Sequence, residues 1–235
     1  MFIKFMVFIM SKEVLVIAGS GDIGSAIVEI FSDEHDVKST SREELDLSSS
    51  SSVNSFLSSN TKNFDHVIFC AAENNPRSFN EEKYSNIEKS IKINFLSITE
   101  ILHSLVKNNS INSGGSIIII SSLYANFGRH KRFSYSVSKH ALSGLVKNLA
   151  IELSFNRIRV NSVTPGFIDT KLTRKNLKEE EIRKIEGCIP VGNFGSPKDI
   201  ANVVLFLSSS SSSYINGQDI IADGGYSCGA FFGLE

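Results

Sequence analysis

A short apolar run that leads directly into a glycine-rich loop constrains this chain most strongly. Residues 14–18 read Val-Leu-Val-Ile-Ala, the pattern of a strand that is buried on both faces. Gly19-Ser20-Gly21-Asp22-Ile23-Gly24 follows with the spacing G-x-G-x-x-G, and apolar residues at helical spacing continue to Phe31. A strand, this loop and a helix form the turn that binds the pyrophosphate of a dinucleotide in α/β proteins. A plain turn between a strand and a helix is the alternative.

Strands and helices alternate along the rest of the chain. Segments with helical spacing, such as residues 86–107, separate further runs that are rich in β-branched residues. These runs are residues 36–40, 67–72, 116–120, 157–164 and 218–222. The alternation predicts a single-domain Rossmann fold of class α/β, in which a doubly wound parallel sheet carries helices on both faces.

The length of 235 residues suits one domain, which we place at residues 13–235. Residues 1–12 are expected to be an apolar N-terminal extension or the product of a misassigned start. The charged residues at 171–186 predict a helical, mobile lid over a cleft. The serine run at 208–213 predicts a loop.

Composition excludes several classes of function. Apolar residues make up 41% of the chain, charged residues 21%, and the formal net charge is -1, which is typical of a soluble globular protein without nucleic-acid partners. The apolar start is too short to span a membrane, so no membrane partner is expected. The three cysteines are far apart and form no metal-binding cluster, so we expect no metal and a reducing, cytoplasmic location.

Tyr135 and Lys139 are four residues apart in a segment with helical spacing. This spacing places the phenol and the ammonium on one helix face. A neighbouring cation lowers the pKa of a phenol, which would bring Tyr135 toward the range in which it can transfer protons at neutral pH. A packed tyrosine beside a solvated lysine is the alternative for the pair alone.

The end of the second predicted strand bears on the choice of cofactor. A carboxylate at this point binds the ribose 2′-hydroxyl of NAD, whereas an arginine accommodates the 2′-phosphate of NADP. Thr40, Ser41 and Arg42 occupy the region, and no acidic residue precedes Glu43. The sequence therefore favours NADP(H) over NAD(H), although Arg42 could equally be a solvated loop charge.

With the glycine loop, Ser122, Tyr135, Lys139 and the Pro165-Gly166 pair in this order, the chain resembles the short-chain dehydrogenase/reductase family over residues 13–229. The most similar branch includes the 3-oxoacyl-acyl-carrier-protein reductases. The segments that carry the resemblance are residues 135–139, 159–166, 214–218 and 223–225.

The resemblance implies an enzyme that interconverts a ketone and a secondary alcohol. Tyr135 would be the general acid in reduction and the base in oxidation, and Ser122 would hydrogen-bond the substrate oxygen. Lys139 would bind the nicotinamide ribose and lower the pKa of Tyr135. Asn94 would complete a water-linked proton relay. Relatives are usually tetramers, so the resemblance also implies a homo-oligomer, a tetramer or a dimer.

The resemblance further implies which residues contact the cofactor. The loop at 165–170 would meet the nicotinamide, and Asp46 would approach the adenine. The expected cofactor set is Gly19, Ser20, Gly21, Asp22, Ile23, Gly24, Thr40, Ser41, Arg42, Asp46, Leu47, Cys70, Ala71, Ala72, Tyr135, Lys139, Pro165, Gly166, Ile168 and Thr170.

Two motifs depart from the family pattern. The family's glycine loop reads TGxxxGxG, whereas this loop is one residue shorter, with Ala18 for the threonine and Asp22 at a glycine position. The family's Asn-Asn-Ala-Gly is replaced here by Phe69-Cys70-Ala71-Ala72. These departures bear on cofactor binding more than on catalysis.

Three functions remain open. The first is reduction of a small ketone of the 3-oxoacyl type. The second is the same chemistry on a sugar or polyol in glycan biosynthesis, and the third is a non-catalytic NAD(P) sensor. The basic loop at 129–132 could meet a phosphate or acidic group of the substrate, or be a solvated rim or a subunit contact.

Overall fold

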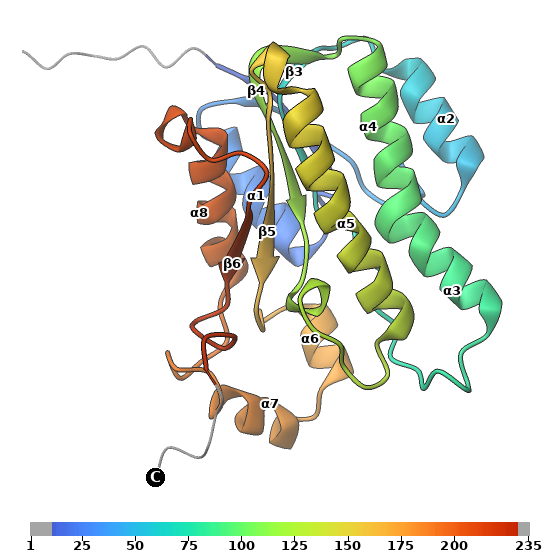
Figure 1. Ribbon diagram of the computed structural model, residues 1–235, viewed down its shortest axis with the longest axis vertical. Coiled ribbons are helices and arrows are strands. Elements are labelled where there is room, and N and C mark those ends of the chain that lie inside the picture. Colours follow the sequence, from blue (N-terminus) through green and yellow to red (C-terminus); the bar gives the residue numbers. More distant parts are fainter. Residues whose placement is uncertain (1–10, 230–235) are drawn as a thin grey trace, which may run out of the picture.

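A computed structural model describes residues 11–229 of the chain and shows one six-stranded sheet in the order β2-β1-β3-β4-β5-β6, with every neighbouring pair parallel (Figure 1). The predicted single-domain Rossmann fold is therefore confirmed. The strands are β1 (Glu13–Ile17), β2 (Asp36–Ser39), β3 (Phe64–Phe69), β4 (Ile111–Ile120), β5 (Arg159–Pro165) and β6 (Asp219–Ala222). The longer helices are α1 (Asp22–Ser32), α2 (Ser50–Ser59), α3 (Tyr84–Ile91), α4 (Ser97–Lys107), α5 (Phe133–Glu152), α6 (Lys171–Asn176), α7 (Glu179–Glu186) and α8 (Pro197–Ser208).

Helices cover both faces of the sheet because successive strand residues point to opposite sides. On one face, Leu15 of β1 belongs to a buried cluster that includes Ile98 of α4 and Leu142 of α5. On the other face, Val16 packs in a cluster with Ile27 of α1 and Val204 of α8. Figure 1 shows α1 and α8 on one side of the strands and α2, α4 and α5 on the other.

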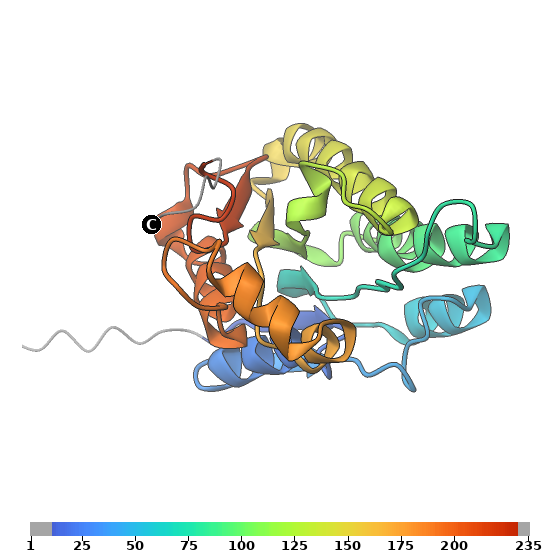
Figure 2. The ribbon, with the colours of Figure 1, turned by 90° about the horizontal axis from the view of Figure 1, so that it is seen from below.

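The order of the strands determines where a ligand can bind. β1 pairs with β2 on one side and with β3 on the other, so the chain changes direction across the sheet at this point. In open parallel sheets such a switch leaves a crevice at the carboxyl ends of the strands. Figure 2, viewed from that end, shows α6 and α7 in front of the strands. The expected lid at 171–186 is therefore two short helices, separated at Leu177 and Lys178.

Three local expectations differ from the structure. The strand expected at 116–120 is longer, because β4 already begins at Ile111 and its register with β3 shifts around Gly114-Gly115. Glycine is needed because a Cβ on Gly115 would lie 2.6 Å from the Asp65 carbonyl oxygen. The long helix at 86–107 contains a π-helical turn, Lys92–Leu96. The serine run closes α8 and forms a 3₁₀ helix, Ser210–Ser212, because its hydroxyls bond nearby backbone groups.

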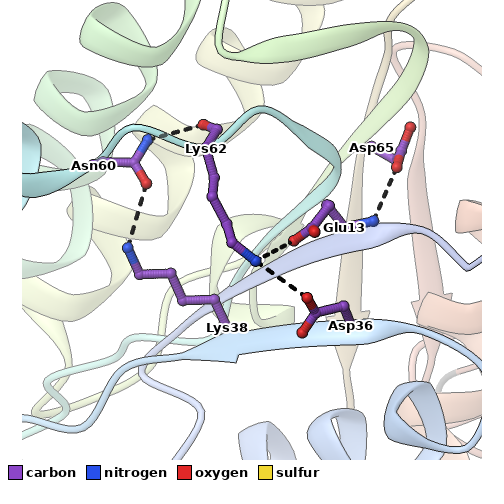
Figure 3. Close-up of polar contacts among 6 residues, drawn as sticks. All are labelled: Glu13, Asp36, Lys38, Asn60, Lys62 and Asp65. Carbon is purple, nitrogen blue, oxygen red and sulfur yellow. Dashed lines mark hydrogen bonds and ion pairs between the residues drawn. The ribbon is translucent and has the colours of Figure 1, made fainter.

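The amino ends of the strands carry a polar network that fixes the edge strand β2 (Figure 3). Lys62 Nζ lies 2.9 Å from Glu13 Oε2 and 3.1 Å from Asp36 Oδ2, so it joins β1 to β2. The Glu13 amide donates to Asp65 Oδ2 at 2.9 Å, and Lys38 Nζ donates to Asn60 Oδ1 at 3.3 Å. These pairs lie at the opposite end of the sheet from the crevice.

Two expectations concern the chain start and the membrane. The apolar extension expected at 1–12 lies outside the described residues apart from Ser11 and Lys12. Within residues 11–229, every helix is too short or too polar to cross a bilayer.

A buried histidine in β3 predicts a loss of stability in mild acid. The His66 ring nitrogen Nδ1 lies 2.9 Å from Ser116 Oγ of β4, and burial lowers the pKa of His66 to about 4. Between pH 6.5 and 4 the unfolded chain therefore binds a proton that the folded chain does not, so stability is lost as pH falls through this window. One such group changes the free energy of unfolding by up to about 1.4 kcal/mol per pH unit, or roughly 3 kcal/mol over the window.

Urea unfolding of the wild type and of His66→Gln at several pH values between 7 and 4 measures this effect. The glutamine can still hydrogen-bond Ser116 but does not titrate, so its stability should fall less steeply with acid. Equal slopes for both proteins would contradict the assignment to His66.

Candidate active site

A cavity of about 570 Å³ lies at the carboxyl ends of β1, β3, β4 and β5, between their following loops and α6. Most of the residues that the sequence predicts for the site line this cavity. They are Ser20, Gly21, Asp22, Ile23, Gly24, Cys70, Ala72, Ser122, Tyr135, Lys139, Pro165, Gly166, Ile168 and Thr170. The crevice at the strand switch is thus the place where the predicted catalytic and cofactor residues meet.

The end of β4 and the start of α5 bring Ser122 and Tyr135 together. β4 ends two residues before Ser122, and α5 begins two residues before Tyr135. After Ile120, Ser122 caps a 3₁₀ helix, Leu123–Ala125, and its Oγ accepts from the Tyr124 amide at 3.3 Å. Tyr135 lies in the first turn of α5, and its phenol is hydrogen-bonded to the Ser122 side chain. Both hydroxyls therefore face the same point in the cavity, where a carbonyl oxygen could bind.

The pKa of Tyr135 moves in the direction opposite to the sequence expectation. Burial raises the pKa of Tyr135 to about 12, and the hydrogen bond with Ser122 and the charge of Arg132 act against this rise. The expected lowering by Lys139 does not occur because Lys139 Nζ is directed at the Ile120 carbonyl oxygen, 2.8 Å away, and lies 5.8 Å from the Tyr135 ring centroid. The phenol is consequently protonated at neutral pH, the form that an acid catalyst needs.

Lys139 is a buried cation that has more hydrogen-bond donors than acceptors around it. Its side chain is 1% exposed, and burial lowers its pKa to about 8. An ammonium has three donors, and the Ile120 carbonyl oxygen is the one acceptor within hydrogen-bond distance of Nζ among residues 11–229. Hydroxyl groups of a ribose would supply the missing acceptors. The adjacent Cys70 thiol is neutral, because burial raises its pKa to about 12.

The glycine loop has the shape that a phosphate requires. Gly21 has φ -74°, which any residue can adopt, and a Cβ there would meet no atom closer than the Ala18 oxygen at 3.9 Å. Glycine at this position therefore leaves space toward the cavity, whereas a Cβ on Gly24 would lie 2.5 Å from the same oxygen. No side chain caps α1 at Gly21, so the first amides of the helix are available to an anion. The residues present fit the pyrophosphate of a dinucleotide.

Asp22 stands at the position where the family has glycine, yet its carboxylate turns away from the loop. Its Oδ2 accepts from the Lys171 amide at 2.7 Å and thereby connects the start of α1 to the start of α6. The contact links the glycine loop to α6, whose residues line the cavity.

The residues predicted for the adenine end lie outside the cavity. Thr40 is buried, and its Oγ1 accepts from the Ala18 amide at 3.1 Å, so it supports the glycine loop from behind. Arg42 is exposed and has no carboxylate within 4.0 Å among the described residues. The Asp46 carboxylate bonds the amide and hydroxyl of Ser48. The remaining residues of the prediction that do not line the cavity are Gly19, Ser41, Leu47, Ala71 and Asn94.

Asn94 lies at the π-helical turn, fully buried, and its amide is occupied by protein groups. Its Oδ1 accepts from the Glu73 amide at 2.7 Å, and its Nδ2 donates to the Glu73 carbonyl oxygen and to Ser138 Oγ. The side chain thus holds the loop after β3 against the helix that carries Tyr135 and Lys139. Its part in a proton relay stays a prediction.

Sequence reasoning left two arginines of the cavity unresolved. Arg129 and Arg132 line the cavity together with Tyr124 and Phe167, although the sequence could not distinguish them from a solvated rim. Their basic character was visible in the sequence, but their direction depends on how the loop between β4 and α5 folds back over Tyr135.

Together, the parallel sheet, the open glycine loop and the buried tyrosine–lysine pair define a dinucleotide-binding α/β protein of the oxidoreductase class. The family model described as Enoyl-(Acyl carrier protein) reductase matches residues 13–227. The chain belongs to the short-chain dehydrogenase/reductase family of NAD(P)-dependent oxidoreductases.

Relatives by sequence have two kinds of name. The 3-oxoacyl-acyl-carrier-protein reductase FabG of Aquifex aeolicus is 33% identical over 221 residues, which are 91% of this chain and 87% of that protein. FabG of Buchnera aphidicola is 41% identical over 138 residues, 59% of this chain, and the match spans only 56% of that relative's length. L-rhamnose-1-dehydrogenase of Scheffersomyces stipitis is 38% identical over 154 residues, 63% of this chain and 58% of that protein.

Solved structures share the fold over nearly the whole chain. A short chain dehydrogenase family protein from Francisella tularensis has a TM-score of 0.86 at 26% identity, covering 94% of this chain and all of that one. BdcA in complex with NADPH has a TM-score of 0.83 at 24% identity, covering 92% of this chain and 95% of that one.

Proposed function

We propose that this protein reduces a small ketone to a secondary alcohol with NADP(H), using Tyr135 as the general acid. The observation that carries the proposal is the meeting of Ser122, Tyr135 and Lys139 in one cavity with the open glycine loop. A protonated phenol, a second hydroxyl beside it and a lysine with free donors are the groups that such a reduction needs.

A bound nicotinamide cofactor supplies the hydride. The residues of the chain do the rest. The hydroxyls of Ser122 and Tyr135 hold the carbonyl oxygen of the substrate, and the phenol of Tyr135 gives this oxygen the proton that completes the alcohol. Lys139 binds the ribose of the cofactor with the donors that Ile120 leaves free. In oxidation the proton moves in the opposite direction.

A second candidate is the same chemistry on a sugar or polyol, which the similarity to L-rhamnose-1-dehydrogenase supports. The similarity to FabG supports a 3-oxoacyl-like ketone instead. A non-catalytic NAD(P) sensor is the candidate from another class of function. Such a sensor would not need a protonated phenol beside Ser122, because it transfers no proton.

A panel assay separates these candidates. NADPH consumption is followed with small ketones, 3-oxoacyl thioesters and keto-sugars, and NADPH binding is measured in parallel. The proposal expects turnover of a ketone or thioester. Turnover of keto-sugars alone would favour the second candidate, and NADPH binding without any turnover would favour the sensor.

Arg42 is proposed to make NADP(H) the preferred cofactor. The structure of BdcA, which has a similar fold, contains NADPH and is consistent with this proposal. Arg42→Gln should lower the ratio of kcat/KM for NADPH to that for NADH by about tenfold or more, since hydrogen bonds to charged groups are each worth about 1.5–3 kcal/mol. Steady-state kinetics with both cofactors measure the ratio. Arg157→Gln, which removes an exposed arginine at the other end of the sheet, is the control. An unchanged ratio in Arg42→Gln would refute this role.

The oligomeric state and the cellular location are also proposals. We expect a homo-oligomer, a tetramer or a dimer. Exposed apolar side chains, such as Ile151 on α5 and Phe155 just beyond its end, are consistent with subunit contacts. A cytoplasmic location and a small-molecule partner likewise accompany the proposed activity.

A further inference from the structure

Two arginines in the catalytic cavity have no acidic partner. Arg129 and Arg132 both line the cavity that contains Ser122 and Tyr135. Among residues 11–229, no carboxylate oxygen lies within 4.0 Å of either guanidinium. Two like charges that line one cavity repel one another, and an anion bound by both would offset this repulsion. The pair therefore calls for an explanation from a ligand.

Arg129 is exposed, but its guanidinium makes defined contacts at the cavity. Its Nη1 donates to Tyr124 Oη at 2.7 Å, and its Cζ lies 5.6 Å from the ring centroids of both Tyr124 and Phe167. Tyr124 belongs to the segment after β4 and Phe167 to the loop after β5, so the guanidinium is held between two separate segments. Such stacking fixes a planar guanidinium while leaving its outer donors free for an anion.

Arg132 provides the second cation from just before α5. Its Nε is buried and has no hydrogen-bond partner, and its Nη1 donates only to the Lys131 carbonyl oxygen at 3.3 Å. Burial lowers the pKa of Arg132, and the charge of Arg129 adds to this effect. A buried donor without a partner costs free energy, which an anionic ligand in the cavity would offset.

The arginines lie close to the reacting group. The Tyr124 ring meets the Tyr135 ring edge-on, with centroids 6.1 Å apart, and the same Tyr124 holds Arg129. Arg132 is near enough to Tyr135 for its charge to lower the pKa of that phenol. An anion bound by the pair would thus belong to the same small molecule as the carbonyl that Tyr135 protonates.

We infer that the substrate carries an anionic oxygen group, a carboxylate or a phosphate, within a few bonds of its reactive carbonyl, and that Arg129 and Arg132 bind this group. The inference rests on the proposed reduction and narrows its substrate class. A neutral sugar or simple ketone would leave both guanidiniums without a counter-ion. The phosphates of the cofactor already have a place at residues 20–24, on the loop after β1, whereas both arginines follow β4.

Matched pairs of ketones test the inference. Acetoacetate is compared with its methyl ester, and dihydroxyacetone phosphate with dihydroxyacetone. Each pair keeps the reactive carbonyl and removes the negative charge, by esterification in the first pair and by loss of the phosphoryl group in the second. The wild type should prefer the anion of at least one pair by about 10- to 100-fold in kcat/KM. The pair that shows the preference identifies the group as a carboxylate or a phosphate. Equal or better turnover of both neutral partners would overturn the inference and leave the proposed reduction intact.

Variants assign the preference to the two arginines. Arg129→Met and Arg132→Met should each reduce the anion-to-neutral ratio by about tenfold or more, with a smaller change in KM for NADPH. Lys131→Met is the control, because it removes one positive charge from the same loop at a residue that does not line the cavity. Equal losses for anionic and neutral ketones, or the same change in Lys131→Met, would contradict the assignment.

If none of these ketones is reduced, that result counts against the proposed function. A binding measurement then tests the anion site separately. Calorimetry with 3-hydroxybutanoate and glycerol 3-phosphate is done on wild type and Arg129→Met, both saturated with NADP⁺. Binding that the variant loses supports the anion site without the reduction. Absence of binding of both probes to the wild type overturns the inference.

Discussion

Replacing Lys139 by methionine is expected to lower kcat at least about 100-fold and to raise KM for NADPH, without loss of stability. The ammonium is the group that would hold the ribose of the cofactor beside Tyr135. Its burial lowers its pKa to about 8 from an ordinary 10.5. At pH 7 the buried ammonium therefore destabilises the folded wild type by roughly 3 kcal/mol, a cost that the methionine variant does not have. The variant instead loses the hydrogen bond to the Ile120 carbonyl oxygen, which is worth about 1–3 kcal/mol. The variant should be as stable as the wild type or up to about 2 kcal/mol more stable.

The sign of this effect depends on pH in a defined way. Between pH 8 and 10.5 the unfolded chain holds a proton on Lys139 that the folded chain has released, so the wild type gains stability as pH rises through this window. Any stability advantage of Lys139→Met should therefore be largest below pH 8 and shrink toward 10.5. Urea unfolding at pH 7 and 9.5 measures it, with the exposed Lys147→Met as control. Normal turnover, or a variant several kcal/mol less stable, would contradict this account of Lys139.

Replacing Tyr135 by phenylalanine is expected to lower kcat by about 10²- to 10⁴-fold while NADPH binds almost as before. The change removes one oxygen from a buried ring and leaves the ring contact with Tyr124. Because the phenol of the wild type is protonated through the neutral range, reduction should show no titration of Tyr135 between pH 6 and 9. Oxidation of the alcohol should instead become faster as pH rises.

Kinetics and equilibrium binding of NADPH, measured on the same preparations, separate the two effects. Tyr214→Phe serves as control, since Tyr214 is fully exposed and does not line the cavity. A Tyr135→Phe variant that keeps its kcat would remove Tyr135 from the mechanism. A variant that loses NADPH binding to the same extent as turnover would assign it a role in binding instead.

Local patterns explain why much of the fold could be predicted from the sequence. The apolar run at 14–18, the glycine loop and the helix after it are adjacent in the chain, so their arrangement follows from backbone geometry. The spacing of Tyr135 and Lys139 on α5 is equally local, and both line the cavity as expected.

Properties that depend on distant contacts could not be predicted in this way. The pKa of Tyr135 rises because its surroundings bury it and because Lys139 is directed at Ile120, a residue of β4. The position of Arg129 depends on Phe167, which is 38 residues further along the chain and reaches it from the loop after β5. The bulge at Gly114-Gly115 likewise arises from the closeness of β3.

The most direct test of the central claim follows a deuterium atom from the cofactor to the product. Purified protein is given the ketone that the panel identifies and NADPH with deuterium at both hydrogen positions of the reactive nicotinamide carbon. The product is examined by mass spectrometry and NMR. The account predicts one deuterium on the carbinol carbon of a secondary alcohol for each NADPH consumed, and almost none with Tyr135→Phe. NADPH that binds in the cavity but transfers no label to any ketone, thioester or keto-sugar would contradict it.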